Sequence, residues 1–292
     1  MNASQQTTVG IIGLGAMGAP MTRRLLEAGT PVVLTSRREQ PELVAAGATW
    51  AGTAREVGAA ADVVLLMLPD LPEVEQVLAG ADGLLAEAGD LLLMIGSTSS
   101  ATAVRALAEQ LDAGTDGRVR VLDCPVSGGV DGAEAGTLSI MLGGSEADAA
   151  LAATVLAPCG NPVHLGPLGA GEVAKACNQM VVAATILAIG EASVLAERSG
   201  LDLEQLWTLL GGGYAGSTLL RSRHRKVVDA DYSASGMAKY MVKDLSFATD
   251  VATATGTNAA LLPALSAAFG ELTERGLGDE DIAVTRKFVA ER

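Results

Sequence analysis

Hydrophobic residues in the first half of the chain come in short runs, separated by glycine turns and Ala-rich stretches. The runs have the length and the branched side chains of buried strands: 9–12, 31–35, 63–68, 91–95, 119–123 and 138–142. The stretches between them follow a helical pattern, as at 16–27, 72–78 and 101–111. Alternating strands and helices are typical of a largely parallel, doubly wound α/β sheet.

The second half of the chain has a different pattern. After about residue 165 the strand pattern stops, and residues 172–198 run almost without a helix breaker until Ser199 and Gly200. A helix this apolar on all sides is expected to be buried between domains or against another subunit. We therefore predict a sheet domain over residues 1–165 and an all-α domain over residues 166–292, joined by the long helix.

Composition and charge exclude several classes of protein. The net charge of −14 and pI near 4.5 argue against binding to nucleic acid or to an anionic membrane surface. Three cysteines without C-x-x-C spacing, together with two histidines, predict buried free thiols and no metal site. The polar start of the chain and the lack of a long uninterrupted apolar run predict a cytoplasmic protein.

A glycine turn directly follows the first predicted strand and opens a helix. Gly13, Gly15 and Gly18 have the G-x-G-x-x-G spacing of a dinucleotide site, and Leu14, Ala16 and Met17 complete the turn. The first glycine allows the tight turn, the second lets the backbone approach a pyrophosphate, and the third lets helix and strand pack closely. We predict a Rossmann domain with a nucleotide site; a purely structural turn is the alternative.

The end of the second predicted strand indicates which nucleotide is bound. NAD sites place an acidic residue there to accept from the ribose 2′-hydroxyl, whereas this chain has Ser36, Arg37 and Arg38. Guanidinium groups can hold a 2′-phosphate bidentately. This favours NADP(H) over NAD(H), with a solvated surface pair of arginines as the alternative.

Several motifs together resemble the β-hydroxyacid dehydrogenase family, which includes 3-hydroxyisobutyrate dehydrogenase and tartronate semialdehyde reductase and has a 6-phosphogluconate dehydrogenase-like architecture. The resemblance spans nearly the whole chain. The motifs, in order, are Gly10 to Gly18, Met67 to Asp70, Asp123 to Gly129, Gly169 to Gly171 with Lys175, and Lys243 to Leu245. It implies an NAD(P)-dependent oxidoreductase acting on a small anionic carbonyl or hydroxy acid, and a homodimer or homotetramer.

Lys175, Asn178 and Gln179 are three and four residues apart, which places them on one face of the long helix. A lysine among apolar residues is costly to bury unless it has a partner or a task, although it can also extend to solvent. The resemblance implies that Lys175 is the catalytic acid and base and that Asn178 orients the substrate. Some relatives have Asn at the next position, so we assign no substrate contact to Gln179.

Other site residues lie where predicted strands end. Ser127, Gly128 and Gly129 form a turn that could hold a carboxylate with backbone N–H groups, and the resemblance makes them the substrate site. Thr98 is expected near the nicotinamide, and the backbone of Leu68 and Pro69 beside the adenosine. By resemblance, Lys243 brings a positive charge to cofactor and substrate.

The predicted function is hydride transfer between NADPH and a short semialdehyde or β-hydroxy acid. Small residues between Gly211 and Thr218 resemble a loop of tartronate semialdehyde reductases, and succinic semialdehyde, glyoxylate and 3-hydroxyisobutyrate stay open as substrates. The alternatives are an NADPH-dependent imine reductase and a non-catalytic nucleotide-binding pseudo-dehydrogenase. Lys175 argues against both, since imine reductases generally replace this lysine.

Overall fold

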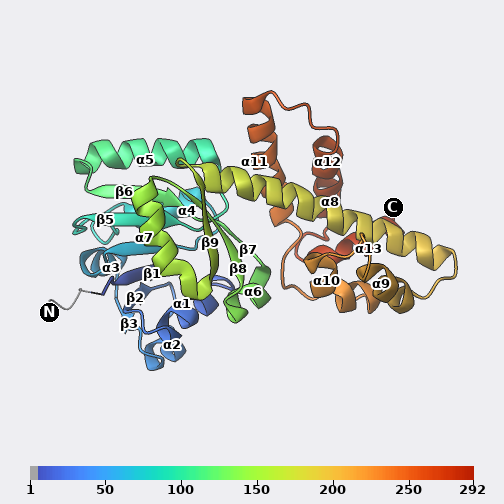
Figure 1. The fold of residues 1–292 in the computed structure, drawn as a ribbon, viewed down its shortest axis with the longest axis horizontal. Helices are drawn as coiled ribbons and strands as arrows, with labels where there is room; N and C mark the ends of the chain where they lie inside the picture. Colours follow the sequence, from blue (N-terminus) through green and yellow to red (C-terminus); the bar gives the residue numbers. More distant parts are fainter. Residues whose placement is uncertain (1–5) are drawn as a thin grey trace. The chain divides into compact units, whose positions relative to one another are not determined.

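The computed structural model describes residues 6–292, and its strands form one nine-stranded sheet (Figure 1). In this part of the chain the strands are β1 (Val9–Ile12), β2 (Val32–Thr35), β3 (Thr49–Trp50), β4 (Val63–Leu66), β5 (Leu91–Ile95), β6 (Val119–Asp123), β7 (Val126–Ser127), β8 (Leu138–Gly143) and β9 (Gly160–Gly166). The strand order is β3-β2-β1-β4-β5-β6-β8-β7, with β9 paired to β8. All pairs from β3 to β6 are parallel, which confirms the predicted doubly wound sheet.

Three strands were not predicted from the hydrophobic pattern. β3 and β7 are each two residues long, too short to show a period. β9 pairs parallel to β8 at the edge of the sheet, and most of its residues are exposed or half-buried, including Asn161, Pro162 and His164. An edge strand that buries little needs no apolar run, so its sequence resembles that of a loop.

The helices follow the predicted alternation in the first half and fill the second half. They are α1 (Gly18–Glu27), α2 (Pro41–Ala45), α3 (Ala54–Ala60), α4 (Leu71–Leu78), α5 (Ala101–Thr115), α6 (Gly129–Ala135), α7 (Glu146–Leu156), α8 (Ala170–Arg198), α9 (Leu203–Gly211), α10 (Thr218–Val228), α11 (Tyr240–Thr255), α12 (Leu262–Glu274) and α13 (Thr285–Ala290). Short 3-10 turns lie at Ala157–Cys159 and Ile282–Val284. The first helix begins at Gly18 rather than near residue 16, because the glycine turn uses residues 13–17.

The two faces of the sheet bury alternate residues of the same strands. One face packs Ile11, Leu65 and Met94 against helices α1 and α7. The other face packs Leu66, Ile95 and further strand residues against α3, α4 and α5. Because both faces are covered, the central strands are apolar throughout, which is why the sequence predicted them so closely.

The chain divides into two compact units, residues 1–175 and 176–292, and the division falls within α8, between Lys175 and Ala176. The predicted boundary lies between residues 165 and 166, one residue before the end of β9. The second unit has its own core, in which Ile186 of α8 packs with Leu245, Phe269 and Phe288 from later helices. Each unit therefore buries its own apolar residues.

Helix α8 is long and apolar enough to cross a membrane by length and composition alone, and 44% of that apolar window is buried inside the fold. Core helices of soluble proteins have the same properties, so this is weak evidence for a membrane span. Within the single chain Val181 is 58% and Leu195 is 70% exposed, so the predicted burial of this helix against another subunit stays a prediction. Both lie on a face of α8 that the described chain does not cover.

Candidate functional site

The glycine turn has the geometry that a dinucleotide site requires. Gly13 has φ of +102°, and a side chain there would meet the carbonyl oxygen of Met67 at 2.3 Å. A side chain on Gly18 would meet the Gly13 carbonyl at 1.9 Å, so helix α1 could not approach β1 as it does. A side chain on Gly15 would meet no atom within 4 Å, and the residue is exposed, so its backbone is accessible. The turn thus fits a pyrophosphate at the start of α1.

At the end of β2 the structure presents two exposed guanidinium groups. Thr35 closes the strand, the Ser36 hydroxyl donates to the backbone carbonyl of Arg38, and Arg37 and Arg38 are exposed. Within the part of the chain that the structure describes, neither arginine takes part in an ion pair. Their charges are therefore available to an anionic group beside the glycine turn, since β1 and β2 are neighbouring parallel strands.

The ends of β4 and β5 are joined through Ser99. Asp70 begins α4, where its carboxylate accepts from the N–H of Leu71 at 2.7 Å and from the hydroxyl of Ser99 at 3.3 Å. Leu68 is half-buried and Pro69 exposed just before it, while Thr98 is half-buried at the end of β5. These predicted cofactor residues lie after neighbouring parallel strands, where open α/β sheets bind ligands.

Ser97 adds a buried polar atom to the same strand end. Its side chain is 3% exposed, and its hydroxyl has no hydrogen-bond partner among the described residues. Buried hydroxyls are normally satisfied, so this group marks a place where a ligand or water could bond. Together with the glycine turn and the two arginines, it fits a nicotinamide nucleotide.

Asp123 holds the start of helix α8. Its fully buried carboxylate accepts from the N–H of Gly169 at 2.6 Å and from the N–H of Glu172 at 2.7 Å. Burial raises the pKa of Asp123, and these backbone hydrogen bonds oppose that rise. The residue that ends β6 thus fixes the first turn of α8, which carries the predicted catalytic lysine.

Lys175 is 8% exposed, and its Nζ donates to the carbonyl oxygen of Val126 at 2.8 Å. The carbonyl belongs to β7, so the lysine lies beside the turn of Ser127, Gly128 and Gly129. In that turn Ser127 is half-buried and both glycines are exposed. The structure therefore places the predicted proton-transfer group next to the predicted carboxylate site, within one unit of the fold.

Residues further along α8 anchor the helical unit. Asn178 is half-buried, and its side chain donates to Gln179 Oε1 at 2.8 Å. Gln179 is buried and donates in turn to the buried carboxylate of Asp244. Some relatives have Asn at this position. The longer side chain of Gln179 gives α8 an amide that reaches the carboxylate of Asp244 on α11.

Lys243 and Asp244 differ in their contacts, although they are adjacent on α11. Asp244 is 5% exposed and faces Gln179, whereas the Nζ of Lys243 lies 5.4 Å from the ring centroid of Phe247. Adjacent residues on a helix point about 100° apart, which accounts for these different neighbours. The placement of Lys243 beside the cofactor stays a prediction.

The prediction of buried thiols is correct for Cys124 and Cys159 and wrong for Cys177, although all three cysteines are free. Burial raises the pKa of Cys159 to about 12. Burial, with the charges of Asp123 and Glu172, raises the pKa of Cys124 well above its usual range. Cys177 lies on a face of α8 that the chain leaves exposed.

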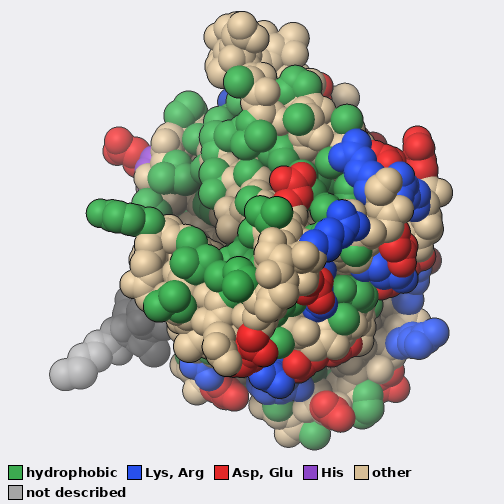
Figure 2. Space-filling model, turned by 90° about the vertical axis from the view of Figure 1, so that its right-hand side faces the viewer, with side chains coloured by type: hydrophobic (Ala, Val, Ile, Leu, Met, Phe, Trp, Pro, Cys, Tyr) green, Lys and Arg blue, Asp and Glu red, His purple; other side chains and the backbone are tan. Residues whose placement is uncertain are grey.

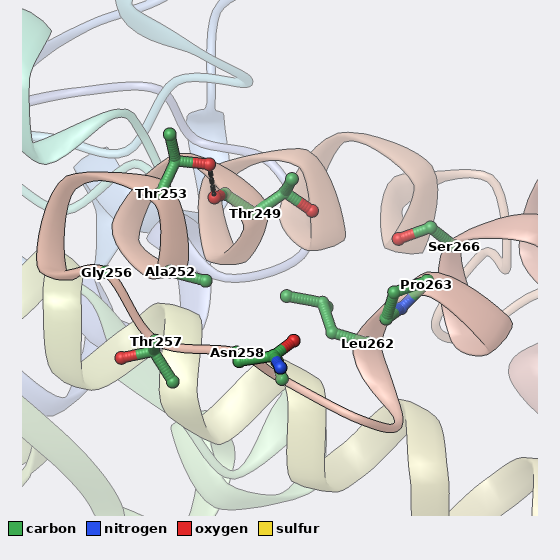
Figure 3. A pocket seen from close by; sticks show the side chains of 10 residues that line it. Thr249, Ala252, Thr253, Gly256, Thr257, Asn258, Leu262, Pro263 and Ser266 are labelled. Atoms are coloured by element: carbon green, nitrogen blue, oxygen red, sulfur yellow. Dashed lines mark hydrogen bonds between the residues drawn. The ribbon is translucent and has the colours of Figure 1, made fainter.

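A surface pocket of about 440 Å³ lies between the end of α11 and the start of α12 (Figure 3). Its ten lining residues in the described chain include no charged side chain, and none is a predicted site residue. The hydroxyl of Thr253 is bonded to its own helix, at the carbonyl of Thr249, 2.9 Å away. We therefore assign this pocket no role in the predicted reaction.

The sequence patterns did not identify Ser99 or Glu172 as site residues. Glu172 is 2% exposed, and its Oε2 accepts from the backbone N–H of Ser99 at 3.0 Å. The available signal was an acidic residue three positions before Lys175 in an otherwise apolar helix. A charge in such a stretch calls for an explanation.

Comparisons with known proteins match both halves of the chain. Residues 8–169 match the model of the NAD binding domain of 6-phosphogluconate dehydrogenase, and residues 169–288 match the model of the NAD-binding domain of NADP-dependent 3-hydroxyisobutyrate dehydrogenase. The chain is 34% identical to NAD-dependent L-serine dehydrogenase of Pseudomonas aeruginosa, covering 96% of each. It is 35% identical to 2-hydroxy-3-oxopropionate reductase of Escherichia coli, covering 86% of each.

A solved structure agrees with these relatives. The 3-hydroxyisobutyrate dehydrogenase of Mycobacterium tuberculosis with L-serine is 32% identical, with a TM-score of 0.82, and the match covers 98% of this chain and 99% of that one. The sheet domain and the helical domain are thus those of known dehydrogenases. The chain belongs to the β-hydroxyacid dehydrogenase family and is an NAD(P)-dependent oxidoreductase.

Proposed function

We propose that this protein transfers hydride between NADPH and a short semialdehyde or β-hydroxy acid, with Lys175 as the acid and base. One observation carries the proposal: a buried lysine is held by the Val126 carbonyl beside the Ser127 to Gly129 turn. A general acid must lie within hydrogen-bond reach of the oxygen that it protonates. A substrate carboxylate on this turn would put its neighbouring carbonyl close to Lys175.

The chain's own residues supply the proton and the orientation. The cofactor, when bound, supplies or accepts the hydride. In reduction, Lys175 donates a proton to the oxygen of the substrate carbonyl as negative charge develops there. In oxidation it removes the proton from the hydroxyl. The Ser127 hydroxyl and the N–H groups of Gly128 and Gly129 hold the carboxylate, and Asn178 orients the reacting end.

NADPH is the proposed cofactor because of the end of β2. The exposed guanidinium groups of Arg37 and Arg38 suit a 2′-phosphate, and the carboxylate that binds a 2′-hydroxyl in NAD enzymes is missing at this place in the sequence. One family model is described for an NADP-dependent enzyme, while one relative is named as NAD-dependent. The preference therefore rests on these two side chains.

Tartronate semialdehyde is the first substrate to test, with succinic semialdehyde, glyoxylate and 3-hydroxyisobutyrate beside it. The Escherichia coli relative is named for 2-hydroxy-3-oxopropionate, which is tartronate semialdehyde. The Pseudomonas relative is named for L-serine, a β-hydroxy acid of the same size. All of these carry a carboxylate close to a carbonyl or hydroxyl group.

The test is consumption of NADPH and of NADH with each aldehyde acid, oxidation of 3-hydroxyisobutyrate and L-serine, and a cyclic imine as the contrasting substrate. We expect turnover with one of the acids and higher catalytic efficiency with the phosphorylated cofactor. Turnover with the imine alone would assign imine reduction instead. Tight NADPH binding without turnover on any compound would support the nucleotide-binding pseudo-dehydrogenase.

We also propose that two copies associate through the exposed face of α8. Val181, Ala188 and Leu195 recur every seven residues and are all exposed. This spacing forms one apolar stripe along a helix. Figure 2 shows hydrophobic side chains gathered mainly over the upper left and centre of the face in view, with most Lys and Arg side chains to their right and below. Light scattering should show a dimer or tetramer that Leu195→Glu weakens; a monomeric wild type would contradict this.

A further inference from the structure

Glu172 is a buried acid in the first turn of α8, three residues before Lys175. The two side chains are 2% and 8% exposed and belong to the same unit of the fold. Residues three apart on a helix are neighbours on its surface, with Cβ atoms roughly 5–6 Å apart. A buried carboxylate and a buried ammonium at this spacing offset part of each other's desolvation cost.

The carboxylate of Glu172 has a second, fixed contact. Its Oε2 accepts from the backbone N–H of Ser99 at 3.0 Å, and the hydroxyl of Ser99 donates to Asp70. The segment from Ser97 to Ser99 ends β5, where the nicotinamide half of the cofactor is expected. Glu172 therefore connects the helix of the lysine with this strand end.

The charge of Glu172 also reaches the strand segment that holds the lysine. The charges of Asp123 and Glu172 contribute to the raised pKa of Cys124, after burial. Cys124 lies two residues before Val126, whose carbonyl accepts from Lys175. Glu172 and Lys175 thus both have contacts with the segment from Cys124 to Val126, one through its charge and one through a hydrogen bond.

Other charged groups around this turn have different contacts. The Asp123 carboxylate accepts from the N–H groups of Gly169 and Glu172, so its charge is compensated by the helix start. Arg105 of α5 donates from Nε to the carbonyl of Leu168, at 2.8 Å. Asp70 is separated from Glu172 by Ser99. Glu172 is the acid that shares a helix face with Lys175.

We propose that Glu172 is a positioning residue for the acid and base: its carboxylate keeps Lys175 in the ammonium form and ties the first turn of α8 to the end of β5. The kinetic consequence rests on the proposed function, whereas the effect on the lysine does not. In aldehyde reduction the ammonium is the active form, so Glu172 extends activity to higher pH. Removing the charge moves the alkaline loss of reductase activity to lower pH.

The direct test is an NMR titration of Lys175 in the cofactor-free protein. The chain has five lysines, so selective labelling of lysine side chains gives few signals, and Lys175→Met identifies the relevant one. Glu172→Gln keeps an oxygen for the Ser99 N–H but removes the charge. We expect the titration midpoint of Lys175 to fall by about one pH unit or more, the size of effect that a nearby opposite charge produces.

Glu191→Gln is the matched control, because Glu191 is an exposed acid on the same helix. This variant should leave the midpoint of Lys175 unchanged. If Glu172→Gln fails to fold, Glu172→Asp and Glu172→Asn form a second pair that differs only in charge. The same midpoint with and without the charge, in whichever pair folds, would overturn the proposal.

A pH profile of the reductase activity separates this proposal from the proposed function. With an active aldehyde acid, the alkaline limb of the reductase pH profile should move down in Glu172→Gln together with the NMR midpoint. A role limited to holding the Ser99 backbone would change KM or kcat and leave the limb in place, which would contradict the proposal. If no acid is reduced, the proposed function fails, and the NMR titration still decides the role of Glu172.

Discussion

The Nζ of Lys175 lies 2.8 Å from the carbonyl oxygen of Val126, to which it donates a hydrogen bond. Val126 immediately precedes the turn of Ser127, Gly128 and Gly129, so the proposed proton-transfer group and the proposed carboxylate site lie next to each other within one unit. Asp123, at the end of β6, holds the start of α8 from the other side. The geometry therefore depends on β6, β7 and the first turn of α8.

Replacing both Arg37 and Arg38 by Ala tests the proposed 2′-phosphate site. Each charge-assisted hydrogen bond contributes roughly 1.5–3 kcal/mol, about 10-fold to 100-fold in affinity. The loss of both arginines should therefore raise KM for NADPH by about 100-fold or more, while KM for NADH stays nearly unchanged. Steady-state kinetics with both cofactors measure this. Arg23→Ala, which removes another exposed arginine of the same domain, is the control. An equal effect on both cofactors would contradict the assignment.

The parallel core of the fold could be predicted because its strands are apolar on both faces. β1, β5 and β6 have the predicted bounds, and β2 and β4 differ only at their ends. The edge strands β7 and β9 could not be predicted in the same way, since they bury few side chains and their pairing is decided by tertiary contacts. The hydrophobic pattern of a sequence reflects burial, so it does not predict strands that bury few side chains at the edge of a sheet.

The site could be predicted where a motif fixes the backbone, and less well where side chains meet across elements. The glycine turn and the arginines after β2 follow from local sequence, whereas the burial of Lys175 was one of two alternatives that its apolar surroundings left open. The bond between Glu172 and Ser99 joins residues 73 positions apart, and nothing local to either residue indicates it. The catalytic role of Lys175 came from the family resemblance and stays a prediction.

Asp123→Ala should destabilise the protein by about 2 kcal/mol or more, because it leaves buried N–H groups at the start of α8 without their acceptor. Urea unfolding followed by circular dichroism measures the loss. Asp90→Ala removes an exposed acid of the same domain and should change stability by less than about 0.5 kcal/mol. Equal stability of the two variants would show that the Asp123 contacts contribute little.

Stability should fall at alkaline pH partly through Cys159. Burial raises the pKa of its thiol from 9.0 to about 12, so the folded state keeps a proton that the unfolded state loses. This contribution is fully present below pH 9 and is lost as pH rises towards about 12, by up to about 4 kcal/mol. In Cys159→Ala the fall in unfolding free energy over this range should be smaller. An unchanged slope would contradict the prediction; Cys177→Ala, at an exposed site, is the control.

The central claim, proton transfer by Lys175, is tested most directly with Lys175→Ala and its rescue by added amines. With the preferred aldehyde acid, kcat should fall by about 10²-fold to 10⁴-fold, the usual contribution of a general acid, while NADPH affinity measured by calorimetry stays close to that of the wild type. Small primary amines should restore part of the rate, since they can occupy the vacated space and donate the proton. Turnover that survives the substitution would contradict the account.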